Sequence, residues 1–98
     1  MRVSGKPTII NGTLTSANTE YEIDLPKNCH KFTVQARTNV VLKIAFIAGN
    51  SGTAYITIPS SANYWEDGIR TNSNIYAQSP TAGAVIEVIA WSGGDDLL

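Results

Sequence analysis

The chain has 98 residues, of which 43% are hydrophobic and 15% are charged, and its net charge is −1. This length suits a single domain, and the scattered basic side chains argue against binding to nucleic acid or to a membrane surface. Soluble domains usually carry about 25% charged residues, so part of this surface is expected to be covered by another molecule.

The first half of the chain predicts short strands that begin with a hairpin. Thr8–Ile10 and Thr13–Thr15 flank Asn11 and Gly12, a pair that tolerates the positive φ angles of a two-residue turn. Tyr21–Leu25 alternates apolar and polar residues, and so does His30–Arg37. This alternation is typical of strands with one buried face.

The second half predicts four more strands. They are expected at Val40–Ala48, Thr53–Ile58, Asn74–Ser79 and Ala84–Trp91, and Glu66–Gly68 is expected to be a turn. About eight short strands and no helical period predict an all-β fold, an antiparallel β-sandwich. A jelly roll is favoured over an immunoglobulin-like sandwich, whose Cys…Trp…Cys spacing is missing. Residues 1–91 are expected to form this single domain and residues 92–98 a flexible C-terminal tail.

Two predicted strands are apolar on both faces. Val41, Ala45 and Ile47 occupy the second face of one strand, and Val85, Ile89 and Trp91 occupy that of the other. Such strands need a cover on each side. Loops or the first hairpin can supply it, or the face is a subunit interface. Lys43 and Glu87, the one charge on each strand, either pair across strands or subunits, or lie solvated at the rim of an apolar patch.

No residues form a convincing catalytic or metal-binding pattern. Cys29 and His30 are neighbours, but adjacent strand residues point to opposite faces, and the chain has no second histidine. Glu20, Glu22 and Asp24 share a strand face, where a solvated surface is favoured over a Ca²⁺ site. We therefore expect no enzymatic activity, no cofactor and no metal.

The pair Tyr64 and Trp65 is the best candidate for recognition. Two large aromatic side chains beside a turn either close one end of the sandwich or lie exposed and bind a sugar or a protein. The adjacent carboxylates Glu66 and Asp67 do not suit a glycosidase, because neighbours in a turn do not straddle a sugar ring.

Two segments resemble small virion proteins of tailed bacteriophages. Tyr64–Ile69 and Asn74–Trp91 carry a Tyr-Trp-Glu-Asp turn before a final Val-Ile-Glu-Val-Ile-Ala-Trp strand, and Lys31–Arg37 is similar in style. The resemblance implies a capsid decoration (cement) subunit that binds and stabilises the assembled shell. The alternative is a glycan- or receptor-binding module of a tail or fibre.

Further expectations follow from this resemblance and from the apolar strand faces. The partner is another virion protein, above all the major capsid protein, and the chain self-associates, with a homotrimer favoured. The protein is made in the host cytoplasm without a signal peptide and resides in the virion. The candidate interface residues are Tyr64, Trp65, Val85, Ile89 and Trp91.

Overall fold

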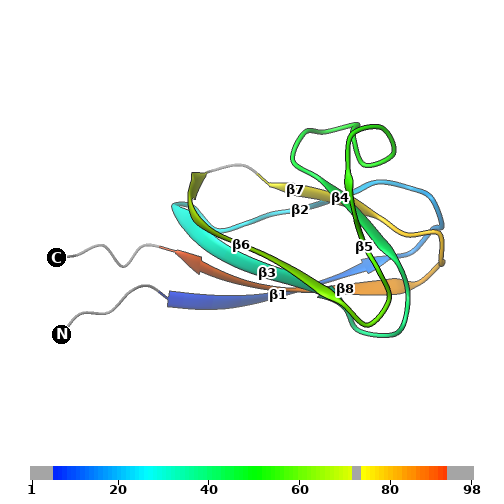
Figure 1. Ribbon diagram of the computed structural model, residues 1–98, viewed down its shortest axis with the longest axis horizontal. Helices are drawn as coiled ribbons and strands as arrows, with labels where there is room; N and C mark the ends of the chain where they lie inside the picture. Colours follow the sequence, from blue (N-terminus) through cyan, green and yellow to red (C-terminus); the bar gives the residue numbers. More distant parts are fainter. Residues whose placement is uncertain (1–5, 72–73, 93–98) are drawn as a thin grey trace, which may run out of the picture.

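The computed structural model describes residues 6–71 and 74–92. Eight strands succeed one another along the chain (Figure 1): β1 Lys6–Leu14, β2 Tyr21–Ile23, β3 Cys29–Ala36, β4 Leu42–Ala45, β5 Ile56–Ile58, β6 Asn63–Thr71, β7 Ile75–Gln78 and β8 Ala84–Ser92. Within these ranges, no helix has the length and apolar character needed to cross a membrane. The predicted flexible tail falls on residues outside the described ones, except Ser92, which ends β8.

The strands form two four-stranded antiparallel sheets, one with the order β1-β8-β3-β6 and the other with the order β2-β7-β4-β5. The two sheets lie as separate layers, with β1, β8 and β3 in one and β2, β7 and β4 in the other (Figure 1). The chain forms four strand pairs: β1–β8, β2–β7, β3–β6 and β4–β5. These are the pairs of one long hairpin whose turn joins β4 to β5 and which is folded over into two sheets. This connectivity is the jelly roll, and the predicted fold class is confirmed.

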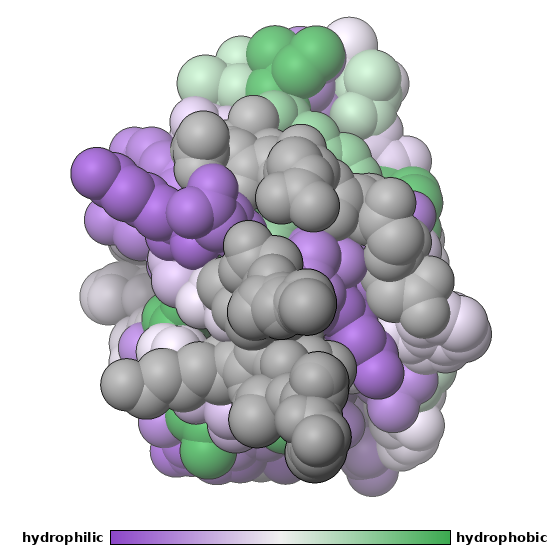
Figure 2. Space-filling model, turned by 90° about the vertical axis from the view of Figure 1, so that its left-hand side faces the viewer, coloured by the Kyte–Doolittle hydropathy of each residue, from purple (hydrophilic) through white to green (hydrophobic). Residues whose placement is uncertain are grey.

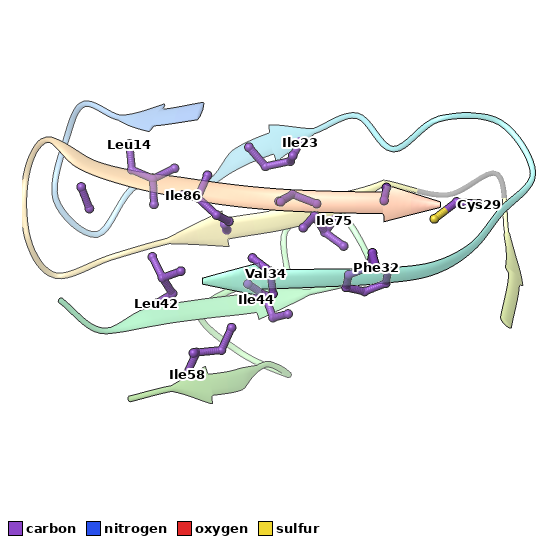
Figure 3. Close-up of a cluster of buried hydrophobic side chains, with 14 residues drawn as sticks. Leu14, Ile23, Cys29, Phe32, Val34, Leu42, Ile44, Ile58, Ile75 and Ile86 are labelled. Atoms are coloured by element: carbon purple, nitrogen blue, oxygen red, sulfur yellow. The ribbon is translucent and has the colours of Figure 1, made fainter. Parts of the chain in front are cut away.

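The core lies between the sheets and is built by every second residue of the strands, as period-two alternation requires. Figure 3 shows these side chains pointing from both sheets into the shared interior. In β8, the inward residues Ala84, Ile86, Val88 and Ala90 are all buried. Among the described residues, the largest fully buried side chain is that of Phe32 in β3, whose ring centroid lies 6.1 Å from that of Phe46.

The predicted hairpin at Asn11 and Gly12 is wrong, because β1 runs straight through both residues. Asn11 pairs with Glu87 and Gly12 with Ile86 of β8. Gly12 faces the core, and a Cβ atom there would lie 3.0 Å from Ile23 Cδ1 and 3.3 Å from Ile86 Cγ2. Glycine is present at this position because the opposite sheet approaches closely, and not because the chain turns.

Replacement of Gly12 by valine is therefore expected to lower the free energy of unfolding by about 1–3 kcal/mol, the usual effect of overpacking a core. Urea denaturation followed by circular dichroism measures the change. Thr13→Val is the matched control, since Thr13 is exposed on the other face of the same strand and valine suits a strand. Equal stability of Gly12→Val and the wild type would contradict the close approach.

The predicted turn at Glu66–Gly68 is also wrong, because these residues lie within β6. In the register of the sheet, Glu66 pairs with Phe32 and Asp67 with Lys31 of β3. Because Tyr64 and Trp65 are neighbours in this continuous strand, their side chains point to opposite faces of the sheet. Tyr64 packs against the core, and Trp65 is 58% exposed on the opposite face.

The apolar run Val40–Ala48 forms a shorter strand than predicted. β4 ends at Ala45, and the connection to β5 carries Phe46 and Ile47, which are exposed. The Glu20 carboxylate holds this connection by accepting hydrogen bonds from Gly49 N at 2.7 Å, Ser51 N at 3.0 Å and Ser51 Oγ at 2.6 Å. These hydrogen bonds, that of the Ser51 hydroxyl above all, lower the pKa of Glu20. Glu20 is thus an anchor for the β4–β5 connection, whereas the sequence predicted only a solvated charge.

Candidate functional site

The outer face of the β1-β8-β3-β6 sheet carries a straight row of side chains that crosses all four strands. In the strand register, Ile9 of β1 pairs with Ile89 of β8, Ile89 with Thr33 of β3, and Thr33 with Trp65 of β6. We call these four residues the apolar row. Ile9 is 70% exposed, Trp65 58% and Ile89 37%, so three large apolar side chains meet solvent on one face of the sheet.

A polar group flanks the apolar row on one side. Glu87 of β8 accepts a hydrogen bond from Gln35 Nε2 at 3.0 Å and pairs with Arg37 Nε at 2.7 Å. The hydrogen bond from Gln35, and next the contact with Arg37, lower the pKa of Glu87. The Glu87 carboxylate is therefore ionised at neutral pH and fixed in position beside the row.

A cation and an aromatic ring flank the row on its other side. Lys31 of β3 pairs with Trp91 of β8 in the register, and Lys31 Nζ lies 4.8 Å from the centroid of the Trp91 ring. A cation over an indole face is attracted by the ring quadrupole. The described side chains of the two flanks thus differ: Glu87 lies with Gln35 and Arg37 on one side of the row, and Lys31 lies with Trp91 on the other.

The surface between the row and the Glu87 flank is hollowed. A depression of about 280 Å³ is lined by Ile9 and Ile89 from the row and by Asn11, Gln35, Arg37 and Glu87 from the flank. It combines apolar walls with amide, guanidinium and carboxylate groups. Such a surface is suited to recognition, because Gln35 and Arg37 hold Glu87 in place and the apolar groups lack a cover.

Four of the five predicted interface residues lie on this face. Trp65 and Ile89 belong to the apolar row, Trp91 belongs to the flank, and Val85 lies on the same side of β8. Tyr64 points the other way: its ring centroid lies 6.2 Å from that of Phe32, and its hydroxyl donates a hydrogen bond to Glu66. Burial, and then Glu66, raise the pKa of Tyr64 to about 12.

The sequence reasoning missed Ile9, which is the most exposed large apolar residue among the side chains described on this face. The signal was present, because Ile10, Gly12 and Leu14 alternate with Ile9, Asn11 and Thr13. The turn prediction at Asn11 and Gly12 interrupted that alternation.

Cys29 and His30 do not form a catalytic pair. The Cys29 side chain is buried and lies 3.4 Å from the Lys31 carbonyl oxygen, to which its thiol donates. Burial raises the pKa of Cys29, which is the opposite of thiol activation. The His30 Nε2 atom is buried and has no hydrogen-bond partner. Among the described residues, no three His, Cys, Asp or Glu side chains gather to hold a metal ion.

A second apolar surface lies at the connection between β4 and β5. Phe46, Ile47, Tyr55 and Ile56 are between 40% and 64% exposed, and we call them the β4–β5 surface. Hydrophobic residues gather at the top of Figure 2, at the height where Figure 1 draws this connection. Lys43 Nζ lies 5.0 Å from the centroid of the Tyr55 ring. Because β4 and β8 belong to different sheets, Lys43 and Glu87 are not cross-strand neighbours within one chain.

No protein-family model matches this chain, and no curated protein sequence is similar to it. A de novo designed double-stranded β-helix is 12% identical, with 89% of this chain and 99% of that chain covered and a TM-score of 0.53. The cupin domain of an XRE family transcriptional regulator from Enterobacter cloacae is 9% identical, with coverages of 89% and 98% and a TM-score of 0.51. A protein of Bacillus endospore appendages, described as disulfide-linked pili, is 14% identical, with coverages of 93% and 88% and a TM-score of 0.50. These likenesses show the fold alone, and membership of a bacteriophage family stays a prediction.

Proposed function

We propose that this chain is a non-enzymatic structural subunit of a bacteriophage particle, a decoration protein that binds the assembled capsid and stabilises the shell. The observation that carries the proposal is the exposure of large apolar side chains on two surfaces of a chain with few charges. Contiguous exposed apolar surface on a small domain usually marks a binding site. The choice of a capsid as the partner rests on the resemblance of Tyr64–Ile69 and Asn74–Trp91 to virion proteins.

The absence of catalysis is part of this proposal. The jelly-roll fold does not decide it, since one fold supports many functions. The chemistry of the individual residues supports it: the Cys29 thiol is held protonated by burial, and Glu87, the carboxylate beside the depression, is already bonded to Gln35 and Arg37. A group engaged in this way is poorly placed to accept a proton from a substrate.

The β4–β5 surface is the one that we expect to contact the shell. It combines three residues of a connection with Ile56, the first residue of β5, and aromatic residues such as Phe46 and Tyr55 are frequent anchors at protein interfaces.

Co-sedimentation tests this proposal. The purified protein is mixed with undecorated capsids and, separately, with host cells, and the pellets are analysed. We expect the protein in the capsid pellet, with at least a tenfold weaker association for Ile47→Glu, because a charge would have to be buried in the contact. Thr81→Glu, an exposed position in the connection between β7 and β8, is the matched control. Failure to pellet with capsids would overturn the proposal.

A glycan- or receptor-binding module of a tail or fibre is the second candidate, and the exposure of Trp65 favours it. An indole ring that is 58% exposed on the face of a sheet can stack on a sugar ring. In the same experiment this function predicts sedimentation with host cells, and the loss of that sedimentation in Trp65→Ala. Sedimentation with capsids alone would exclude it.

A further inference from the structure

We propose that two copies of this chain pair face to face through the outer surface of the β1-β8-β3-β6 sheet, around a two-fold axis that runs along the apolar row. The proposal goes beyond the capsid contact and does not depend on it. In this pair, the face that carries Ile9, Ile89 and Trp65 is covered by the same face of a second copy.

The size of the face agrees with the needs of a dimer. Four strands spaced by about 4.8 Å, together with the width of the outer side chains, span roughly 20 Å, and strands of nine residues, such as β1 and β8, span roughly 30 Å. Two copies would therefore cover a total of about 1,200 Å², which is the lower limit for specific protein interfaces. Since the smaller interfaces are commonly weak, we expect an association in the micromolar range.

The apolar row has the geometry that two packed sheets require. It crosses the strands at right angles, because its members are register partners on adjacent strands. A two-fold axis along the row places the row of each copy on that of the other, so that Ile9, Ile89 and Trp65 all leave solvent together. Sheets packed in this way lie about 10 Å apart.

The charges beside the row favour this axis. Rotation about the row exchanges its two flanks, so the Lys31 flank of one copy lies over the Glu87 flank of the other. Lys31 Nζ lies 4.8 Å from the centroid of the Trp91 ring, and Lys31 is the register partner of Asp67 on β6. The Glu87 side chain keeps 28% of its surface exposed, which leaves it accessible to a second cation. Each copy thus offers an ammonium group where the other offers a carboxylate.

The symmetry also explains why the contact stops at two copies. A face that binds itself forms a closed pair, whereas a ring of three requires two different surfaces that fit each other. The homotrimer expected from the virion resemblance would have to join this face to another surface of the chain. Because the row and its flanks are self-complementary, they favour the two-fold pair.

Exchange of charges between the two flanks tests the axis. In Lys31→Glu, residue 31 of each copy repels the partner's Glu87, and in Glu87→Lys, residue 87 repels the partner's Lys31. In a mixture of the two variants, both contacts join opposite charges. Sedimentation equilibrium over 1–200 µM protein should show pairs for the wild type, at least a tenfold weaker association for each variant alone, and recovery in the mixture.

Asp24→Lys and Lys27→Glu are the matched controls, because both residues are exposed in the connection between β2 and β3. They should associate like the wild type, and circular dichroism should show that all variants remain folded. A single-chain mass for the wild type at every concentration would overturn the proposal and assign the face to a different protein. A mass of three chains, or a mixture that associates no better than its components, would overturn the two-fold axis.

Discussion

Replacement of Phe32 by alanine is expected to lower the free energy of unfolding by about 3–5 kcal/mol, the usual cost of a phenylalanine truncation in a core. Phe32 is the largest fully buried side chain of the described residues, and its ring contacts those of Phe46 and Tyr64 at centroid distances of 6.1 and 6.2 Å. Domains of this size are commonly stable by only 5–15 kcal/mol. Urea denaturation should therefore show a large drop in midpoint or a chain that is already unfolded in buffer.

Phe46→Ala is the matched control for this prediction. Phe46 is 44% exposed, so its truncation removes less buried surface and leaves a site open to solvent in place of a closed cavity. We expect a clearly smaller loss of stability than for Phe32→Ala. If the two variants were equally stable, Phe32 would not be at the centre of the core.

Ile86→Glu and Ile89→Glu are expected to have opposite consequences, although both residues lie in β8. Ile86 is fully buried, and a carboxyl group there would lack a partner in the apolar interior. Burial of such a group costs several kcal/mol even when it becomes protonated, so Ile86→Glu should not fold. Ile89 is 37% exposed at the centre of the apolar row, and Ile89→Glu should keep the stability of the single chain within about 1 kcal/mol.

The two variants are compared by far-UV circular dichroism and by sedimentation. Ile89→Glu should show the β-sheet spectrum of the wild type while losing its association, because two carboxylates would meet at the two-fold axis. A folded Ile86→Glu protein would contradict the strand register. A folded Ile89→Glu protein that associates like the wild type would show that the apolar row is not the contact.

The sequence predicted which residues share a face of a strand more successfully than it predicted which strands lie side by side. The alternation in Ala84–Trp91 assigned Ile86 and Val88 to one side and Val85, Ile89 and Trp91 to the other, and the structure has this arrangement. Such alternation is a local property of the chain. Which residue of β1 or β6 lies beside Ile89 depends on pairing between distant strands, so the apolar row could not be derived from the sequence.

The wrong turns have a common physical cause. Asn11 and Gly12, and likewise Glu66–Gly68, are residues that favour turns when only their neighbours along the chain are considered. At Gly12, the close approach of Ile23 from the opposite sheet explains why a glycine occurs within a strand. At Glu66, pairing with Phe32 of β3 keeps the chain extended where a turn was predicted. The prediction that Phe46 and Ile47 belong to a strand was wrong for the opposite reason. An apolar run favours a strand locally, but apolar residues can also cover the edge of a core from a connection.

The position of β8 between β1 and β3 has a consequence for the kinetics of folding. Leu14 pairs with Ala84 and Lys6 with Ser92, so the pairing of β1 joins opposite parts of the chain. Chains dominated by such distant contacts fold slowly, typically in milliseconds to seconds, because loop closure precedes the gain from pairing. During synthesis at about 5–20 residues per second, β1 must wait several seconds until β8 has been made. In that interval, the backbone edges of β1 and β3 that pair with β8 in the finished sheet have no partner strand and are exposed to other chains.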